Sequence, residues 1–515
     1  MSETPPGAAP AARPTYWLTR FCILRLLGLV YLVGFLIAAL QGMPLLGSRG
    51  LLPVTAYLTR LETHFGSRFE AFLQVPSLFW IDASDGVLLA AAWAGVALSI
   101  LLLAGWANAI QLLVLWALYM SFVHVGQDWY SYGWEIQLLE TGFLAAFLCP
   151  LLDGRPFPRR APPFAVLVLF RWLAFRIMLG AGLIKIRGDA CWRDLTCLIH
   201  HYETQPNPHL LSRALHFMPV WFHKGGVVVN HLAELAAPWF VFGPRRARLA
   251  AGAFLTAFQG ILILSGNLSF LNWLTIVPIL ACFDDGFLRR VLPRRLHERA
   301  ARAETESLPS GGQRVAVALL VAVVGLLSVP PVLNLLSPRQ AMNTSFNRLN
   351  LVNTYGAFGS VGKRRGEIVF EGTDAAVPSD GAAWREYEWK CKPGDPGRRP
   401  CLVTPYHYRL DWQIWFAAMS RPSRYPWTVH LVSKLLHNDP GALGLLAGNP
   451  FPGAPPRFIR ARYYIYEFAP PDDPSGAWWR RTPAGEWLPP LSAEDPRLLA
   501  FLAAHGWSSR PGPSD

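Results

Sequence analysis

Hydrophobic residues in this chain are gathered into long blocks, and the polar residues lie between those blocks. An apolar stretch of about 20 residues is long enough to cross a bilayer as a helix. The run from 249 to 283 is too long for one crossing, and Asn267 and Asn272 suggest a helical hairpin within it. The sequence therefore predicts an α-helical polytopic membrane protein with about nine spans, at residues 22–41, 86–105, 108–126, 134–152, 164–186, 221–243, 249–266, 268–283 and 314–334.

The composition changes to that of a soluble protein after the last apolar block. Residues 366–372, 385–391 and 457–468 have the pattern of strands, and 409–419 and 427–437 have the pattern of helices. In the second strand, alternation places four residues on one face, as in a half-buried strand: Arg385, Tyr387, Trp389 and Cys391. The pattern indicates a mixed α/β domain.

Three parts follow from these patterns. Residues 1–15, rich in Pro and Ala, are expected to be a disordered head without a cleavable signal peptide. Residues 16–334 form the helical membrane domain, and residues 335–515 form the soluble domain. We expect no internal repeat.

Arginine clusters predict how the chain is oriented. They precede the first predicted span and follow the fourth, sixth and eighth: Arg13 and Arg20; Arg155, Arg159 and Arg160; Arg245, Arg246 and Arg248; and Arg289, Arg290, Arg294 and Arg295. With nine spans, all four clusters fall on the same side, which is the cytoplasmic side by the positive-inside rule. The N-terminus is then cytoplasmic, and the C-terminal domain is lumenal or periplasmic.

Composition agrees with a membrane protein. The chain is 52% hydrophobic and only 16% charged, and its mean hydropathy is +0.25. The net charge of +13 could suggest nucleic-acid binding, but membrane topology explains arginines that lie between apolar spans, so we expect no nucleic-acid partner. The sequence has no nucleophile elbow, zinc-protease motif, phosphate-binding loop or dinucleotide fingerprint. We expect no cofactor and no metal.

Four of the seven cysteines fall in segments that the topology places outside, where disulfides are permitted. Cys391 and Cys401 frame a turn-rich loop and are candidates for a local disulfide. Cys191 and Cys197 could pair or remain reduced thiols in a packed loop. Neither pair is a C-x-x-C redox motif.

Several ionisable residues fall within the predicted spans, where they are costly unless they are paired or functional. We expect Glu135 or Glu140 to pair with Arg171 or Arg176 and so to hold the helices together. His231 and Glu234 share a helix face, but no further metal ligands are spaced to join them. Lys185 and Arg187 lie at the outer end of the fifth span, where snorkelling to the interface could explain them.

Long strings in both halves of the chain resemble the lipase maturation factor family. They include "GWEIQLLETGFLAAFLCPL", "FRIMLGAGLIKIRGDACWRDLTCL", "SGNLSFLNWLTIVPILACFDD", "NTYGAFGS" and "CLVTPYHYRLDWQIWFAAM". The resemblance implies a multi-pass protein of the endoplasmic reticulum membrane, or of the inner membrane if the source is bacterial. It implies a folding and maturation factor, not an enzyme, for secreted dimeric lipases of the lipoprotein lipase type. Thiol-redox folding proteins are possible further partners.

Under this resemblance the C-terminal lumenal domain engages the client. Trp412, Trp415 and Phe416 are candidate client contacts, although they could equally belong to the core. The absence of catalytic motifs is expected of a chaperone, which needs an exposed contact surface and no nucleophile.

The membrane half is also distantly similar to the transmembrane domain of vitamin K-dependent γ-carboxylase. The shared pattern is "AG-x-x-K", followed by an acidic residue and a Trp: Ala181, Gly182, Lys185, Asp189 and Trp192. This similarity implies an alternative: a membrane enzyme that acts on a quinone-like lipid, with Lys185 as the base and His231 nearby. That alternative predicts a deep apolar cavity into which Lys185 points. A folding factor predicts instead that Lys185 is paired with a carboxylate.

Overall fold

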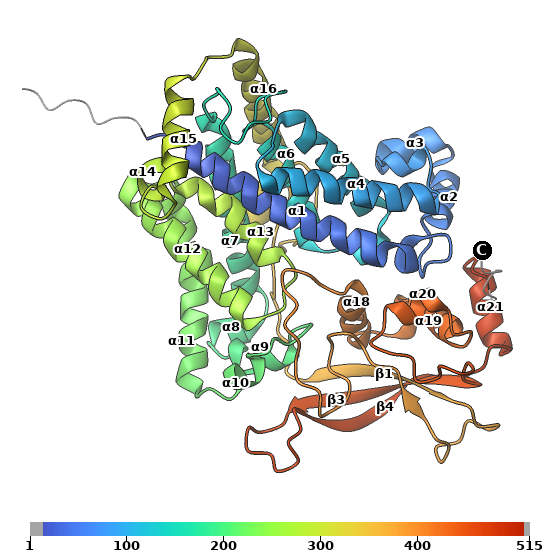
Figure 1. Cartoon of the computed structure of the whole chain (residues 1–515). Helices are drawn as coiled ribbons and strands as arrows, with labels where there is room; N and C mark the ends of the chain where they lie inside the picture. Colours follow the sequence, from blue (N-terminus) through green and yellow to red (C-terminus); the bar gives the residue numbers. More distant parts are fainter. Residues whose placement is uncertain (1–13, 509–515) are drawn as a thin grey trace, which may run out of the picture.

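The computed structural model describes residues 14–508 and has a large helical part and a smaller C-terminal part built on a sheet (Figure 1). The helical part consists of α1 (Trp17–Leu46), α2 (Val54–Phe65), α3 (Arg68–Gln74), η1 (Leu78–Trp80), α4 (Asp85–Ala104), α5 (Ala109–Val125), η2 (Gln127–Tyr130), α6 (Gly133–Ala146), α7 (Phe164–Arg187), α8 (Ala190–Arg193), α9 (Cys197–Thr204), α10 (Ser212–His216), α11 (Val220–His231), the π-turn η3 (Leu232–Ala236), η4 (Ala237–Phe242), α12 (Arg245–Ser265), α13 (Leu271–Ile279), η5 (Leu280–Cys282), α14 (Asp285–Leu288), α15 (Arg294–Thr305), α16 (Gly311–Leu327) and α17 (Val329–Leu336). The predicted head, residues 1–15, lies almost entirely outside the described residues.

Each of the predicted spans contains a helix, but three of these helices have fewer than 18 residues. In the described part of the chain, 6 helical segments have the length and composition of a span: Trp17–Leu46, Asp85–Ala104, Phe164–Arg187, Val220–Phe242, Arg245–Ser265 and Gly311–Leu336. The other three predicted spans correspond to α5, α6 and α13, which are shorter. The prediction of about nine spans is therefore not confirmed. The prediction of a helical membrane protein with a C-terminal mixed domain is confirmed.

Helices α1 and α7 form the centre of the helical part. In each candidate span an apolar stretch of 18 residues can be compared. This stretch is 67% buried in α1 and 72% buried in α7, and at most 39% buried in the other candidate spans. Helix α4 lies close along α1 because Gly95 leaves its face open for the ring of Phe35, where a Cβ would collide. The helices with less buried stretches expose apolar side chains, such as Trp93, Ile100 and Leu264, in the way expected of lipid-facing surfaces.

The segments that carry the arginine clusters meet at one end of the helical part. Arg20 is buried and donates to the carbonyl of Arg160 at 2.7 Å. Arg160 donates to the carbonyl of Leu308 at 3.0 Å, and Arg245 forms an ion pair with Asp284 at 2.7 Å. We call this the arginine-rich end. Which side of a membrane it faces stays a prediction.

The C-terminal part contains a four-stranded antiparallel sheet with helices on one face (Figure 1). The strand order is β2-β1-β3-β4. Its elements are β1 (Arg365–Thr373), β2 (Arg385–Glu386), α18 (Arg409–Ala418), η6 (Pro422–Arg424), α19 (Trp427–Leu435), α20 (Pro440–Gly444), β3 (Phe458–Phe468), β4 (Trp479–Leu491) and α21 (Pro496–Ala504). The predicted strands 366–372 and 457–468, and both predicted helices, are present.

Two strands of this sheet differ from the expectation. The sequence did not reveal β4, which contains Pro483, Pro489 and Pro490. Because β4 is an edge strand, its prolines are tolerated. The predicted strand 385–391 is a strand only at Arg385–Glu386. Beyond it, the Cys391 N–H donates to the Asp411 carboxylate at 2.6 Å in place of a neighbouring strand.

The segment between α17 and β1 returns to the helical part, although the sequence assigned it to the outer domain. Gln340 donates to the carbonyl of Gly180 at 2.9 Å, and Asp189 N–H donates to the carbonyl of Gly359 at 3.0 Å. A single cluster of buried apolar side chains extends through both parts, from Ile23 in α1 to Trp507 near the C-terminal end of the described chain. The two parts therefore share one core.

Candidate functional site at the junction of the two parts

A buried ion pair joins the helical part to the C-terminal part. Glu135 of α6 accepts from Arg409 of α18 at 2.8 Å, and both side chains are at most 1% exposed. The Tyr119 hydroxyl and the Trp134 indole N–H also donate to the Glu135 carboxylate. The Arg409 guanidinium lies 3.6 Å from the centroid of the Tyr130 ring. The sequence offered Glu135 or Glu140 as the partner of Arg171 or Arg176, and in the structure the partner of Glu135 is Arg409 of the C-terminal part.

A second buried carboxylate, Glu140, holds the returning segment. Glu140 forms the predicted ion pair with Arg176 of α7. It also accepts from the backbone N–H of Asn353 at 3.0 Å and from the Tyr355 hydroxyl at 2.7 Å, and Arg176 donates to the Asn353 carbonyl at 2.7 Å. The fourth predicted partner, Arg171, pairs with neither carboxylate and donates to the carbonyl of Ala281 at 2.9 Å.

The sheet is fastened to the loop between α9 and α10. Arg365 of β1 donates to the carbonyls of Glu203 and Pro206, both at 2.9 Å. Glu203 in return accepts from the Phe468 N–H at 2.6 Å. Arg365 and Lys392 both form ion pairs with Glu367, and all three side chains are at most 1% exposed. Burial lowers the pKa of Lys392 to about 8, although the charge of Glu367 opposes this shift.

The three aromatic residues proposed as client contacts lie in this junction. Trp412 is only 4% exposed and packs edge-on against Trp134, with the ring centroids 4.8 Å apart. The Trp415 indole donates to the carbonyl of Thr204 at 3.1 Å, and Phe416 packs near Tyr132. Trp412 is thus buried, and Trp415 and Phe416 are half-buried against the helical part. They contribute to the junction, and the burial of Trp412 agrees with the core alternative. Whether Trp415 and Phe416 also contact a client stays a prediction.

Lys185 is paired with a carboxylate. Its ammonium group forms an ion pair with Glu234, and the Asn230 side-chain oxygen lies 3.4 Å away. Asn230 also donates to Glu234 at 2.9 Å, and the Lys185 ammonium lies 5.1 Å from the centroid of the Trp192 ring. His231 faces elsewhere, with its Nε2 at 3.0 Å from the carbonyl oxygen of Trp192. Arg187, beyond Lys185, contacts Gln340 at 2.8 Å.

The other residues of the "AG-x-x-K" pattern have structural roles around this pair. A Cβ at Gly182 would lie 2.6 Å from Leu235 and 3.0 Å from Glu234, so glycine is needed where α7 meets η3. Glu234 lies in the π-turn η3, and this position lets its carboxylate form the ion pair with Lys185. Asp189 caps α8 by accepting from the Cys191 N–H at 3.0 Å. The pattern is explained by packing and ion pairing, with no need for a catalytic base.

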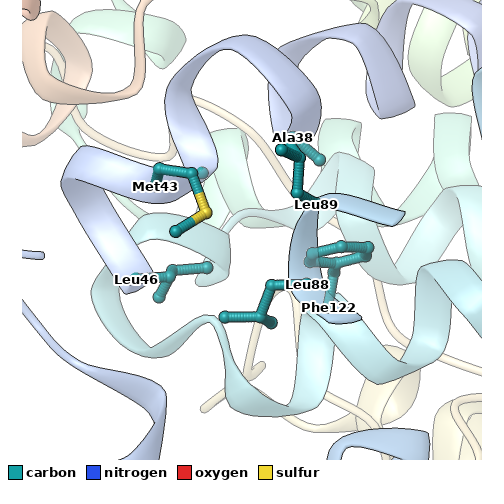
Figure 2. Close-up of a pocket in the computed structure, with 7 residues that line it drawn as sticks. Ala38, Met43, Leu46, Leu88, Leu89 and Phe122 are labelled. Atoms are coloured by element: carbon teal, nitrogen blue, oxygen red, sulfur yellow. The ribbon is translucent and has the colours of Figure 1, made fainter. Parts of the chain in front are cut away.

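The alternative reading also needed an apolar cavity beside Lys185. Figure 2 shows an apolar pocket between α1, α4 and α5, with Met43, Leu46, Leu88 and Phe122 around it. Its cavity volume is about 10 Å³, which is room for about one water and not for a quinone. Neither Lys185 nor His231 lines it.

The cysteine pairs expected from the sequence lie at disulfide distance. The Cα atoms are 4.8 Å apart for Cys191 and Cys197 and 5.5 Å apart for Cys391 and Cys401, within the range of disulfides. Cys191 and Cys197 belong to a small apolar cluster with Trp192 and Val361. The remaining cysteines are unpaired: Cys22, Cys149 and Cys282.

Comparison with known proteins identifies the family. The model described as "Lipase maturation factor transmembrane domain" matches residues 18–290, and "Lipase maturation factor C-terminal domain" matches residues 351–489. The chain belongs to the lipase maturation factor family. Lipase maturation factor 1 of Bos taurus is 49% identical over 98% of this chain and 95% of its own length. The Homo sapiens protein of that name is 48% identical over 99% and 95%.

The family contains a more distant branch. Lipase maturation factor 2 of Homo sapiens is 29% identical over 91% of this chain and 82% of its own length. No solved structure matches the chain. The relatives are named as maturation factors, not as enzymes. The junction described above lies across the two regions that define the family: Glu135 and Glu140 belong to the first, and Arg409, Asn353 and Tyr355 belong to the second.

Sequence patterns did not mark these partners in the second region. Asn353 and Tyr355 stand in the quoted string "NTYG", and Arg409 stands in "YHYRLDW". An arginine at the start of an aromatic, apolar helix was the signal that could have marked Arg409, because such a charge must find a partner when the helix is buried.

Proposed function

We propose that this chain is a membrane-anchored factor that helps secreted dimeric lipases, of the lipoprotein lipase type, to fold and become active. The observation that carries the proposal is the similarity to lipase maturation factor 1 over nearly the whole of both chains. The client would be engaged by the C-terminal part, on the outer side of the membrane. The factor would act by contact, without a catalytic residue or a cofactor.

The side-chain geometry supports a role without chemistry. Lys185, the candidate base of the enzymatic alternative, is buried and ion-paired with Glu234. Buried ion pairs that bridge helices are common structural elements of membrane proteins. The pairing supports a structural role for Lys185 over the role of a base.

The proposal includes a topology. Nine crossings would result if α5, α6 and α13 cross the membrane together with their flanking residues, since successive helices run between the arginine-rich end and the end that contacts the C-terminal part. The arginine-rich end would be cytoplasmic, with the N-terminus, and residues 335–515 would lie in the lumen of the endoplasmic reticulum. Both cysteine pairs would then form disulfides, with thiol-redox folding proteins as partners.

A lipase rescue assay tests the proposal. Cells that lack their own maturation factor would express a secreted dimeric lipase together with this chain, and lipase activity in the medium would be measured. A secreted lipase that is active as a monomer is the control. We expect the chain to restore the activity of the dimeric lipase and to leave the activity of the monomeric lipase unchanged.

A variant of the same assay separates the folding factor from the enzyme. Lys185→Met combined with Glu234→Gln removes both charges of the buried pair and leaves none unpaired. We expect this variant, at equal abundance in the membrane, to restore lipase activity as well as the natural chain does. If the natural chain is present in the membrane and the medium stays inactive, the proposed function is wrong.

A further inference from the structure

The C-terminal part has a surface cavity to which the proposed function assigns no role. It has a cavity volume of about 350 Å³. Three cations line it, Lys390, Arg398 and Arg399, together with Cys401 and two leucines from different parts of the chain, Leu210 and Leu402. We call it the cationic groove. Leu210 belongs to the outer loop before α10, so the groove exists only when the two parts are joined.

The groove is positively charged on balance. Arg398 is partly neutralised, because it forms an ion pair with Glu388 at 3.4 Å and donates to the carbonyls of Trp389 and Lys392. Lys390 donates only to a neutral carbonyl, that of Gly444. Among residues 14–508, no hydrogen bond or ion pair engages the exposed guanidinium of Arg399.

Carboxylates near the groove offset only part of this charge. Asp395 is exposed in the same loop but turns back on its own backbone, where it accepts from the Gly397 N–H at 2.6 Å. Asp411 is fully buried behind the loop and accepts from the backbone of Cys391 and Lys392. The groove lining contains no carboxylate.

The groove also has an apolar rim. Leu402 is 64% exposed and Leu210 is 37% exposed. Isolated exposed leucines are ordinary, but these two border a cavity with unneutralised charge. A ligand that fits must bring carboxylates to Lys390 and Arg399 and apolar side chains to the leucines.

We propose that the cationic groove binds an acidic segment of the client polypeptide, in which glutamates or aspartates stand beside apolar residues. The proposal rests on the proposed function, because a factor that acts by contact must present a surface to a protein, and Trp412 is not available for that contact. The volume accommodates a few side chains and not a folded domain. The disulfide-distance pair Cys391 and Cys401 brackets the loop that carries both arginines and so holds the groove in shape.

Peptide binding to the full-length protein tests this proposal. The protein would be held in nanodiscs of phosphatidylcholine, and binding of a short fluorescent peptide rich in Glu and Leu would be followed by anisotropy. The matched peptide has Lys in place of each Glu. We expect only the acidic peptide to bind, and its affinity to fall when the ionic strength rises from about 0.05 M to about 0.5 M.

Two charge-reversal variants locate the site. Arg399→Glu should lower the affinity for the acidic peptide about fivefold or more. A charge at the rim of a binding site contributes up to about a factor of five to affinity, and reversing it adds repulsion. Arg421→Glu reverses another exposed arginine of the C-terminal part that is not in the groove, and should leave affinity unchanged. Within residues 14–508 the Arg399 side chain has no hydrogen bond or ion pair to lose, so its variant should fold normally.

In the binding experiment, three results would overturn the proposal: equal binding of both peptides, equal weakening by Arg399→Glu and Arg421→Glu, or displacement of the peptide when phosphatidylserine is added to the nanodiscs. The last result would assign the groove to a lipid headgroup. The lipase rescue assay keeps the two proposals apart. If the natural chain restores lipase activity and Arg399→Glu does so equally, the function stands and the groove is not the client site.

Discussion

Arg409 offers the sharpest test of how the two parts are held together. Its guanidinium is 1% exposed and is bound by Glu135, by the carbonyl of Trp129 and by the face of Tyr130. Replacement by Met keeps the apolar stem and removes these contacts. The Glu135 carboxylate then stays buried without its cation and accepts hydrogen bonds from the Tyr119 hydroxyl and the Trp134 indole N–H. Breaking a buried ion pair in this way costs about 3–5 kcal/mol.

Hydrogen exchange of α18 measures this cost directly. If the C-terminal part opens from the helical part without global unfolding, the opening constant reports the free energy of the junction. For Arg409→Met we expect the exchange rate of the α18 amides to rise by about two to four orders of magnitude. Arg421→Met, which removes an exposed arginine of the same part, should change the opening free energy by less than about 0.5 kcal/mol.

A double variant separates the ion pair from the rest of the junction. Glu135→Gln with Arg409→Met leaves no uncompensated charge, so its cost should be smaller than the sum of the two single costs, with a coupling of about 1–3 kcal/mol. The reasoning is refuted if Arg409→Met exchanges as slowly as Arg421→Met, or if the two single costs simply add.

Three further outcomes are expected. Lys185→Met alone should lower the free energy of unfolding by about 3 kcal/mol, because Glu234 is left charged and buried, and thermal scans in detergent should show most of this recovered in the neutral double variant. Mass spectrometry of unreduced peptides should find Cys391 linked to Cys401, and four free outer thiols would contradict both cysteine pairs. Burial, and secondarily Arg409, holds the pKa of His407 well below its usual 6.5, so the unfolded state takes up a proton below pH 6.5 that the folded state does not. Stability should therefore fall by up to about 1.4 kcal/mol per pH unit below 6.5, and less steeply in His407→Phe.

The helical half could be predicted from sequence because its signal is local. An apolar block such as 164–186 can satisfy its backbone only as a helix in a membrane, and α7 (Phe164–Arg187) follows it closely. The number of crossings could not be predicted in the same way. Residues 134–152 are apolar enough for a span, but α6 ends at Ala146, and the following residues form turns at the arginine-rich end.

The candidate site depended on long-range contacts, which sequence patterns do not contain. Glu140 and Arg176 could be matched because both lie within apolar blocks and each requires an opposite charge. Arg409 lies 274 positions from Glu135, beyond the boundary drawn between the two parts. The sequence left open whether Trp412 is a contact or a core residue, because the side chains that cover it, Trp134 and Tyr132, come from the other half of the chain.

Buried charge is a poor general source of stability, since well-packed apolar residues often do as well, but it restricts partners to one geometry. In this chain, carboxylates of the helical part accept from residues beyond α17: Glu135 from Arg409, Glu140 from Asn353 and Tyr355, and Glu203 from Phe468. Contacts distributed over α6 and the α9 loop fix both the position and the rotation of the sheet relative to the helices. A groove formed from Leu210 on one side and the 390–402 loop on the other requires such fixing, because a small rotation would separate its walls. Under the proposed function, the junction would hold the client-binding groove at a set orientation to the membrane.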